Sequence, residues 1–124
     1  MQHLHNNTVV HRDLKSGNIL LALGLLAKVC DFGTARTMVK TENTTQKGTP
    51  RWMAPEIVAG VEANINKMCD VFSYGMVVYE IFSRKVPYDD IPTNALVGLA
   101  VLQGKRPPVL PMLPSFLHPL LKDG

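Results

Sequence analysis

The segment Lys67–Arg84, with the sequence KMCDVFSYGMVVYEIFSR, restricts the possible folds most strongly. It is apolar on nearly every side, which predicts a helix buried at the centre of a packed unit. Asn64 or Asn66 is expected to cap its start, and the helix should continue to about Ser83. Asp70 lies inside this apolar segment, and a buried carboxylate needs hydrogen-bond donors.

Shorter elements are expected around this helix. The apolar runs on either side of Gly24 predict a hairpin over residues 19–30, and Thr93 is expected to cap a helix over residues 94–103 that Gly104 closes. Ser115 is expected to begin a last helix. The remaining predictions are a helix end over residues 1–6, irregular backbone over 8–18, a mobile, threonine-rich surface loop over 31–53 and a proline-rich connector after Gly104.

Composition narrows the function classes. The chain has 124 residues, 46% of them hydrophobic, which suits one packed unit and excludes disorder throughout. The formal charge of +3 is too weak and too scattered to indicate nucleic-acid binding. The longest apolar run, Ile19–Ala27, is about half the length that a bilayer requires, so no membrane segment is expected. Two cysteines outside any CxxC pair indicate reduced thiols in a cytoplasmic compartment.

The most informative polar cluster is HRDLKSGN, residues 11–18, directly before the apolar run. Asp13 and Asn18 lie five positions apart in a segment with no helical pattern. One of them is suited to accept a proton, and the other offers a carbonyl oxygen to a cation. Lys15 adds a compact positive charge suited to a phosphoryl group.

A second oxygen ligand follows at Asp31, after the apolar run and before Gly33. A hairpin over the intervening residues would bring Asn18 and Asp31 together at its two ends. A carboxylate, an amide oxygen, waters and phosphates make the site that Mg²⁺ prefers. Zinc is not expected, because Cys30, Cys69 and the four histidines lack paired ligand spacing.

These motifs resemble those of eukaryotic protein kinases. HRDLKSGN is similar to the family's catalytic loop, H-R-D-L-x-x-x-N, and DFG (31–33) and APE (54–56) follow in the family's order and spacing. The resemblance covers all 124 residues. It implies an α+β, protein kinase-like fold, here a partial carboxy-terminal lobe that is mainly helical with a small hairpin. The single domain, residues 1–124, would run from the end of the family's helix E through its helix H.

The resemblance also implies the catalytic roles. Asp13 would accept the proton of the substrate hydroxyl, Lys15 would contact the transferred phosphoryl group, and Asn18 and Asp31 would hold Mg²⁺ for ATP. Leu20 would lie beneath the adenine ring, within the apolar floor of the nucleotide pocket.

Regulatory residues follow from the same resemblance. Arg12 would pair with a phosphorylated activation loop, which would gain charge-assisted hydrogen bonds. The loop offers several threonines, and Thr44 or Thr45 is favoured because both lie just ahead of KGTPRWMAPE. Lys15 and Thr49 indicate a serine/threonine kinase, in which Thr49 would hydrogen-bond toward Asp13 and Lys15. PRWMAPE and HRDLKSGNIL resemble the tyrosine-kinase-like branch, whose members mostly phosphorylate serine and threonine, and tyrosine or dual specificity stays open as a lesser alternative.

Other motif residues are expected to be structural. His11 would pack in an internal stack with Phe32, and Asp70 would accept backbone N–H groups of the catalytic loop. Glu56 would form the family's buried ion pair, although this chain contains no matching arginine. Cys30 is interpreted as a small buried residue. The alternative is a thiol that reacts with electrophilic ligands of the nucleotide site, as in some kinases.

The chain contains neither a G-x-G-x-x-G loop nor a V-A-I-K lysine, which in the family clamp ATP from an amino-terminal lobe. Two hypotheses therefore stand. In the first, the chain is part of an active protein serine/threonine kinase that acts on protein substrates, although it is inactive by itself. In the second, it is a non-catalytic regulatory or binding fragment, or a product similar to a pseudokinase.

Overall fold

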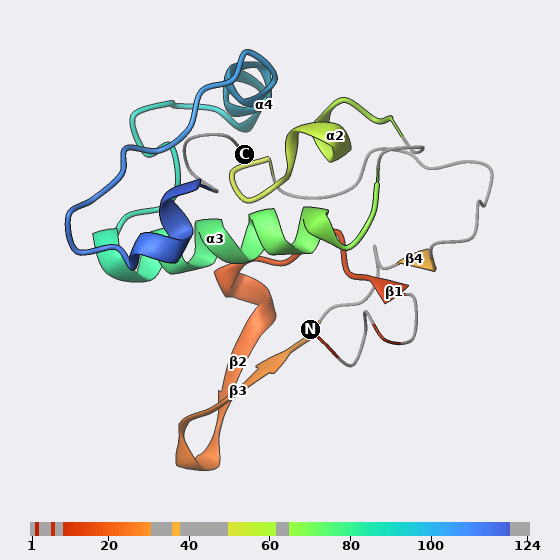
Figure 1. Cartoon of the computed structure of the whole chain (residues 1–124), viewed down its shortest axis with the longest axis vertical. Coiled ribbons are helices and arrows are strands. Elements are labelled where there is room, and N and C mark those ends of the chain that lie inside the picture. Colours follow the sequence, from red (N-terminus) through yellow and green to blue (C-terminus); the bar gives the residue numbers. More distant parts are fainter. Residues whose placement is uncertain are drawn as a thin grey trace.

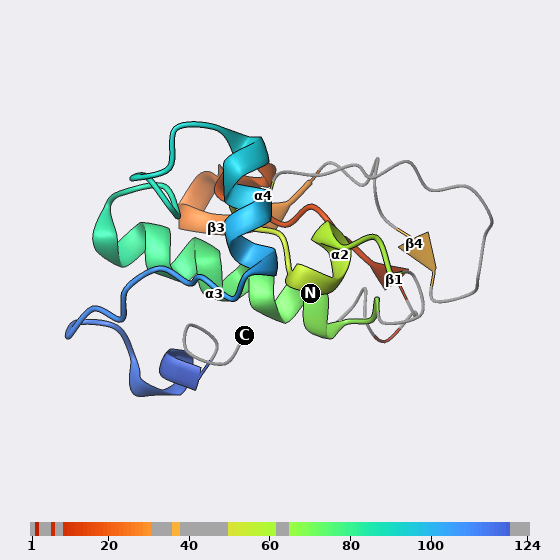
Figure 2. The same ribbon diagram turned by 90° about the horizontal axis from the view of Figure 1, so that it is seen from above.

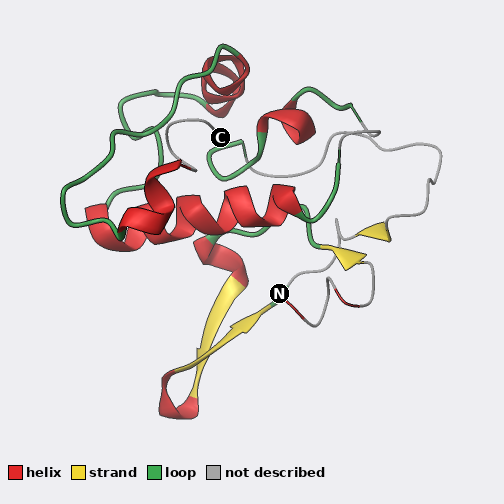
Figure 3. Ribbon diagram, viewed as in Figure 1, coloured by secondary structure: helices red, strands yellow, loops and turns green. Residues whose placement is uncertain are grey.

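The computed structural model describes residues 2, 6, 9–30, 36–37, 50–61 and 65–119, without the side chains of residues 36, 37 and 117. The fold is mainly helical with two small antiparallel strand pairs (Figure 1, Figure 3). Its elements are β1 (Val9–Val10), η1 (Ser16–Asn18), β2 (Ile19–Ala22), η2 (Leu23–Leu25), β3 (Leu26–Val29), β4 (Arg36–Thr37), α2 (Pro55–Val58), α3 (Met68–Ser83), α4 (Asn94–Leu102) and η4 (Ser115–Leu117).

The predicted central helix is confirmed as α3. Asn66 Oδ1 accepts a hydrogen bond from Met68 N at 2.8 Å at its start, and the chain leaves it at Arg84, whose φ of 58° is left-handed. Cys69, Phe72 and Met76 belong to the hydrophobic core together with residues from both flanking segments. The burial is not complete, because Ile81 is 66% exposed near the helix end.

Helices and hairpin lie on opposite sides of α3. α2 and α4 lie above it in Figure 1, and Figure 2 shows α4 crossing over α3. The side chain of Thr93 accepts a hydrogen bond from Leu96 N, so the predicted N-cap of α4 is confirmed. The β2–β3 hairpin projects from the other side of α3 (Figure 1).

The hairpin around Gly24 is also confirmed. β2 and β3 are antiparallel, with Ile19 opposite Val29 and Ala22 opposite Leu26. The turn requires positive φ at Gly24, 76°, a conformation that glycine adopts without steric cost. Leu23 at the turn is fully exposed, at 100%.

Three predicted boundaries were wrong. The segment 8–18 is not wholly irregular, because it contains β1 and η1. The predicted mobile loop includes an ordered end: Trp52 and Met53 are buried in the core, and α2 follows at Pro55. Ser115 does not cap a helix with its side chain, and Pro114 precedes the short 3-10 turn η4 there. No described helix has the length and apolar character needed to cross a membrane.

Candidate functional site

The segment between β1 and β2 brings the three predicted catalytic residues together. The Asp13 carboxylate lies 4.0 Å from Lys15 Nζ, and their side chains are 14% and 29% exposed. Asn18 Nδ2 donates to the Asp13 carbonyl oxygen at 2.7 Å and lies 3.4 Å from Asp13 Oδ2. A carboxylate, an ammonium and an amide thus form one partly accessible polar cluster.

Asp70 of α3 holds the backbone of this segment. Its two carboxylate oxygens accept hydrogen bonds from His11 N at 2.9 Å and Arg12 N at 3.0 Å, and the residue is only 1% exposed. Arg12 has a φ of 71°, a conformation that costs free energy for a residue with a side chain. The two charge-assisted bonds offset that cost. The expected contact between Asp70 and the catalytic loop is therefore present.

His11 supports the segment from inside. It is fully buried, its Nδ1 accepts from Asp13 N at 3.2 Å, and its Nε2 lies 2.9 Å from the Cys30 carbonyl oxygen. An Nδ1 that accepts requires the proton on Nε2, so Nε2 donates to Cys30. The ring thereby ties the backbone of Asp13 to that of Cys30, the residue after β3. Its expected stacking partner, Phe32, lies outside the described residues.

The β2–β3 hairpin brings Asn18 next to Cys30, the residue before Asp31, which is the second predicted metal ligand. Asn18 O accepts from Cys30 N at 2.8 Å, so Asn18 lies opposite the residue that directly precedes Asp31. Asp31 itself lies outside the described residues, as do Thr44, Thr45 and Thr49. Their predicted roles stay predictions.

The predicted roles of Leu20 beneath the adenine ring and of Cys30 in the nucleotide site stay predictions. Leu20 is 57% exposed on β2, so it is accessible to a ligand from that side. Cys30 is half-buried and forms no disulfide, which leaves both interpretations of its thiol standing. Among the described residues, no group of three or more histidine, cysteine or acidic side chains is arranged to hold a metal ion.

Glu80, near the end of α3, makes two contacts that the sequence did not predict. Its Oε1 accepts from Ser16 Oγ at 2.9 Å, and its Oε2 accepts from Trp52 Nε1 at 3.1 Å. The Glu80 carboxylate therefore joins the segment between β1 and β2 to the residues before α2. The sequence did contain a signal for these contacts, because Glu80 is a single acidic residue among the last apolar turns of the helix. A carboxylate in apolar surroundings needs hydrogen-bond donors, as was argued for Asp70.

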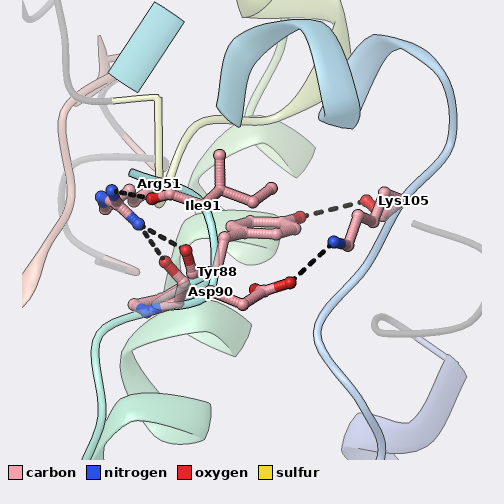
Figure 4. Close-up of polar contacts among 6 residues, drawn as sticks. Arg51, Tyr88, Asp90, Ile91 and Lys105 are labelled. Atoms are coloured by element: carbon pink, nitrogen blue, oxygen red, sulfur yellow. Dashed lines mark hydrogen bonds and ion pairs between the residues drawn. The ribbon is translucent and has the colours of Figure 1, made fainter. Parts of the chain in front are cut away.

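Arg51 is a second missed residue, and it anchors the same short segment to the loop after α3 (Figure 4). Its guanidinium donates to the carbonyl oxygens of Pro87 at 3.0 Å, Tyr88 at 2.7 Å and Ile91 at 2.8 Å. Arg51 Nε also donates to Asn94 Oδ1 at the start of α4. The rigid fork of an arginine suits such a converging set of acceptors.

Glu56 has a partner within the chain other than the expected arginine. Its Oε1 accepts from Cys69 Sγ at 3.2 Å, which links α2 to the first turn of α3. Burial raises the pKa of the Cys69 thiol from 9.0 to about 12, and the neighbouring Glu56 adds to the shift. This cysteine is therefore a protonated core residue at neutral pH, with no nucleophilic character.

Comparison with known proteins identifies the family of the chain. Residues 1–108 match the protein kinase domain family. The chain belongs to the protein kinase family. This match covers more than half of the chain and includes the polar cluster at Asp13.

The curated relatives are named as protein kinases, and several of them as serine/threonine-protein kinases, in agreement with the tyrosine-kinase-like type expected from the motifs. Human mitogen-activated protein kinase kinase kinase 7 is 43% identical over 115 residues, covering 91% of this chain and 18% of the relative. Serine/threonine-protein kinase STY46 of Arabidopsis thaliana is 41% identical over 125 residues, covering 99% of this chain and 20% of the relative. This kinase chain therefore spans about a fifth of the length of these two relatives.

Proposed function

We propose that this chain supplies the catalytic loop of a protein serine/threonine kinase, which transfers a phosphoryl group from ATP to a protein hydroxyl. The observation that carries the proposal is the convergence of Asp13, Lys15 and Asn18 in one accessible cluster, on a backbone that Asp70 fixes. Phosphoryl transfer depends mainly on positioning and charge stabilisation, and a fixed loop of this kind suits both.

Each residue has a definite task in the reaction. The substrate oxygen forms a bond to the transferred phosphorus while the bond from that phosphorus to the leaving diphosphate oxygen breaks, and Asp13 accepts the proton of the hydroxyl. Lys15, 4.0 Å from that carboxylate, contributes positive charge beside the phosphoryl oxygens. Leu20 offers its exposed face to the adenine ring.

Magnesium fits the donor set of the catalytic segment. The Asn18 amide donates through Nδ2, and its Oδ1 accepts no hydrogen bond within the described part of the chain, so that oxygen is available to a hard cation. Asn18 would hold the ion together with Asp31. The bound ion would neutralise charge on the phosphates.

Specificity for serine and threonine is supported by the name of the Arabidopsis relative and by Lys15 and Thr49 in the sequence. Arg12, whose backbone lies in the same segment, would bind the phosphate of a modified Thr44 or Thr45. We further propose a cytoplasmic location, on the basis of the unpaired thiols of the two cysteines. The substrate would be a protein.

The 124-residue chain alone should transfer little phosphate, because its sequence contains no glycine-rich loop and no V-A-I-K lysine. The competing proposal is that the chain acts as a regulatory or binding fragment. It predicts that the parent protein has no kinase activity. Tyrosine or dual specificity is the lesser alternative.

Asp13→Asn in the parent protein that contains this segment tests the proposal. We expect phosphate incorporation from radiolabelled ATP into a generic protein substrate to fall by at least about 10²-fold, the order expected for a positioned acid–base group. Asp90→Asn, which changes an exposed carboxylate outside the cluster, serves as the matched control. Wild-type rates in the Asp13 variant would refute the assigned role. An inactive parent would favour the binding fragment.

A further inference from the structure

A second site lies away from the catalytic cluster, between the end of α3 and the connector 105–112. A cavity of about 440 Å³ opens there. Its walls are mostly apolar and aromatic, from Tyr79, Phe82, Leu110 and Met112. This volume is within the range of small-molecule sites, and aromatic walls favour a flat apolar group.

The charges around the cavity leave one cation without an acidic partner. Asp89 pairs with Lys85 at 3.8 Å, and Asp90 pairs with Lys105 at 2.9 Å, so both acids of the rim are already neutralised. Arg106 also lines the cavity, and it forms no ion pair within the described part of the chain. A bound anion would therefore balance the charge of Arg106.

Arg106 also holds a buried donor that no acceptor satisfies. Its Nη1 donates to Val101 O at 3.2 Å and Lys105 O at 2.7 Å, and its guanidinium lies 5.2 Å from the centre of the Phe72 ring. Its Nε is buried and has no hydrogen-bond partner among the described residues. A buried donor without an acceptor is costly, and such groups are rare in folded proteins.

Tyr88 connects the cavity to the contacts of Arg51. It lines the cavity, its hydroxyl donates to Lys105 O at 3.2 Å, and its carbonyl oxygen accepts from Arg51 (Figure 4). Its φ of 58° is a conformation that costs free energy for a bulky residue and is retained only where the surroundings hold it. Strained residues of this kind gather at ligand sites.

We propose that this cavity binds an aromatic carboxylate, with the ring against Phe82 and Met112 and the carboxylate beside the Arg106 guanidinium. The aromatic walls supply the affinity for the ring. The charge of Arg106, which no acid of the rim balances, selects an anionic group over a neutral one. The proposal uses none of the catalytic residues.

The test is a titration of the isotope-labelled 124-residue chain, followed by NMR, with 2-naphthylacetate and with its neutral analogue 2-naphthylacetamide. We expect saturable shifts at the backbone amides of Lys105, Arg106, Val109, Leu110 and Met112, and at least about tenfold weaker binding of the neutral analogue. A second pair, the peptide Gly-Gly-Trp with a free or an amidated C-terminus, distinguishes a peptide end from a free aromatic acid as the source of the group. Equal binding of acid and amide in both pairs, or shifts outside the cavity, would overturn the proposal.

Variants make the assignment specific. Arg106→Gln should weaken carboxylate binding at least about tenfold and leave binding of the amide unchanged. Met112→Glu removes part of the ring surface and places a negative charge at a position that is 61% exposed, so it should weaken binding of the carboxylate at least about tenfold and binding of the amide less, even if the Arg106 variant fails to fold. Leu102→Glu on α4, at 50% exposure and outside the cavity, is the matched control and should bind as wild type. Wild-type affinity in the Met112 variant would reject the site. None of these measurements involves ATP, so a failure here leaves the proposed kinase function untouched.

Discussion

Asp70→Asn is the substitution that most directly tests how the catalytic segment is held. The aspartate is 1% exposed and accepts from His11 N and Arg12 N, one bond to each oxygen. Asparagine keeps the shape, but it offers one acceptor oxygen and places an NH₂ donor against the other N–H. One buried N–H is thus left unsatisfied, and the remaining bond loses its charge assistance.

The magnitude follows from these two bonds. A hydrogen bond to a charged group contributes about 1.5–3 kcal/mol, and a buried unsatisfied donor costs about 1–3 kcal/mol. We expect the free energy of unfolding to fall by roughly 2–4 kcal/mol, since part of the loss is recovered when the backbone of Arg12 relaxes from its φ of 71°.

Urea unfolding and amide hydrogen exchange measure the global and the local effect. Exchange at His11 and Arg12 should accelerate by about 10²-fold, because each 1.4 kcal/mol corresponds to about a factor of ten. Asp90→Asn, at an exposed ion pair with Lys105, should change neither quantity measurably. Unchanged protection of both amides in the Asp70 variant would refute the argument that this carboxylate fixes the loop.

Three further predictions concern the segment before α2 and the core. Arg51→Met removes the donor to three carbonyl oxygens and should lower the unfolding free energy by about 2–4 kcal/mol in urea titration; Arg51→Lys should recover part of it, and an unaffected Met variant would contradict the anchoring role. Glu80→Ala should shift the fluorescence of Trp52, the only tryptophan, to longer wavelength, and an unchanged spectrum would show that the bond between them does not hold the indole in place. Burial raises the pKa of Cys69 from 9.0 to about 12 and that of Tyr88 from 10.0 to about 12, so the unfolded chain releases these protons first as the pH rises. The contribution of these two groups to the unfolding free energy should therefore be fully present below about pH 9 and decrease toward pH 12. The decrease should be shallower in Cys69→Ala and in Tyr88→Phe, and the wild-type slope in both variants would refute the burial argument.

Local pattern was sufficient for the main elements of this chain. The apolar run from Met68 predicted α3, Thr93 predicted the start of α4, and Gly24 predicted the hairpin turn, because helix periodicity, capping and positive φ are properties of a few neighbouring residues. The motif HRDLKSGN was equally local. Its spacing identified Asp13, Lys15 and Asn18 as one cluster before their distances were known.

Only the tertiary structure decided which distant groups meet. Glu80 reaches both Ser16 and Trp52, and Arg51 reaches the carbonyl oxygens after α3, across separations that no local pattern encodes. The same holds for the cavity beside Arg106, whose unsatisfied Nε exists because the connector folds back onto α3. Sequence by itself determined the main elements and the polar groups of the candidate site, since these depend on residue type and near neighbours. The packing of α3 against its surroundings decided how those groups are held, since buried polar atoms must find partners wherever the fold brings them.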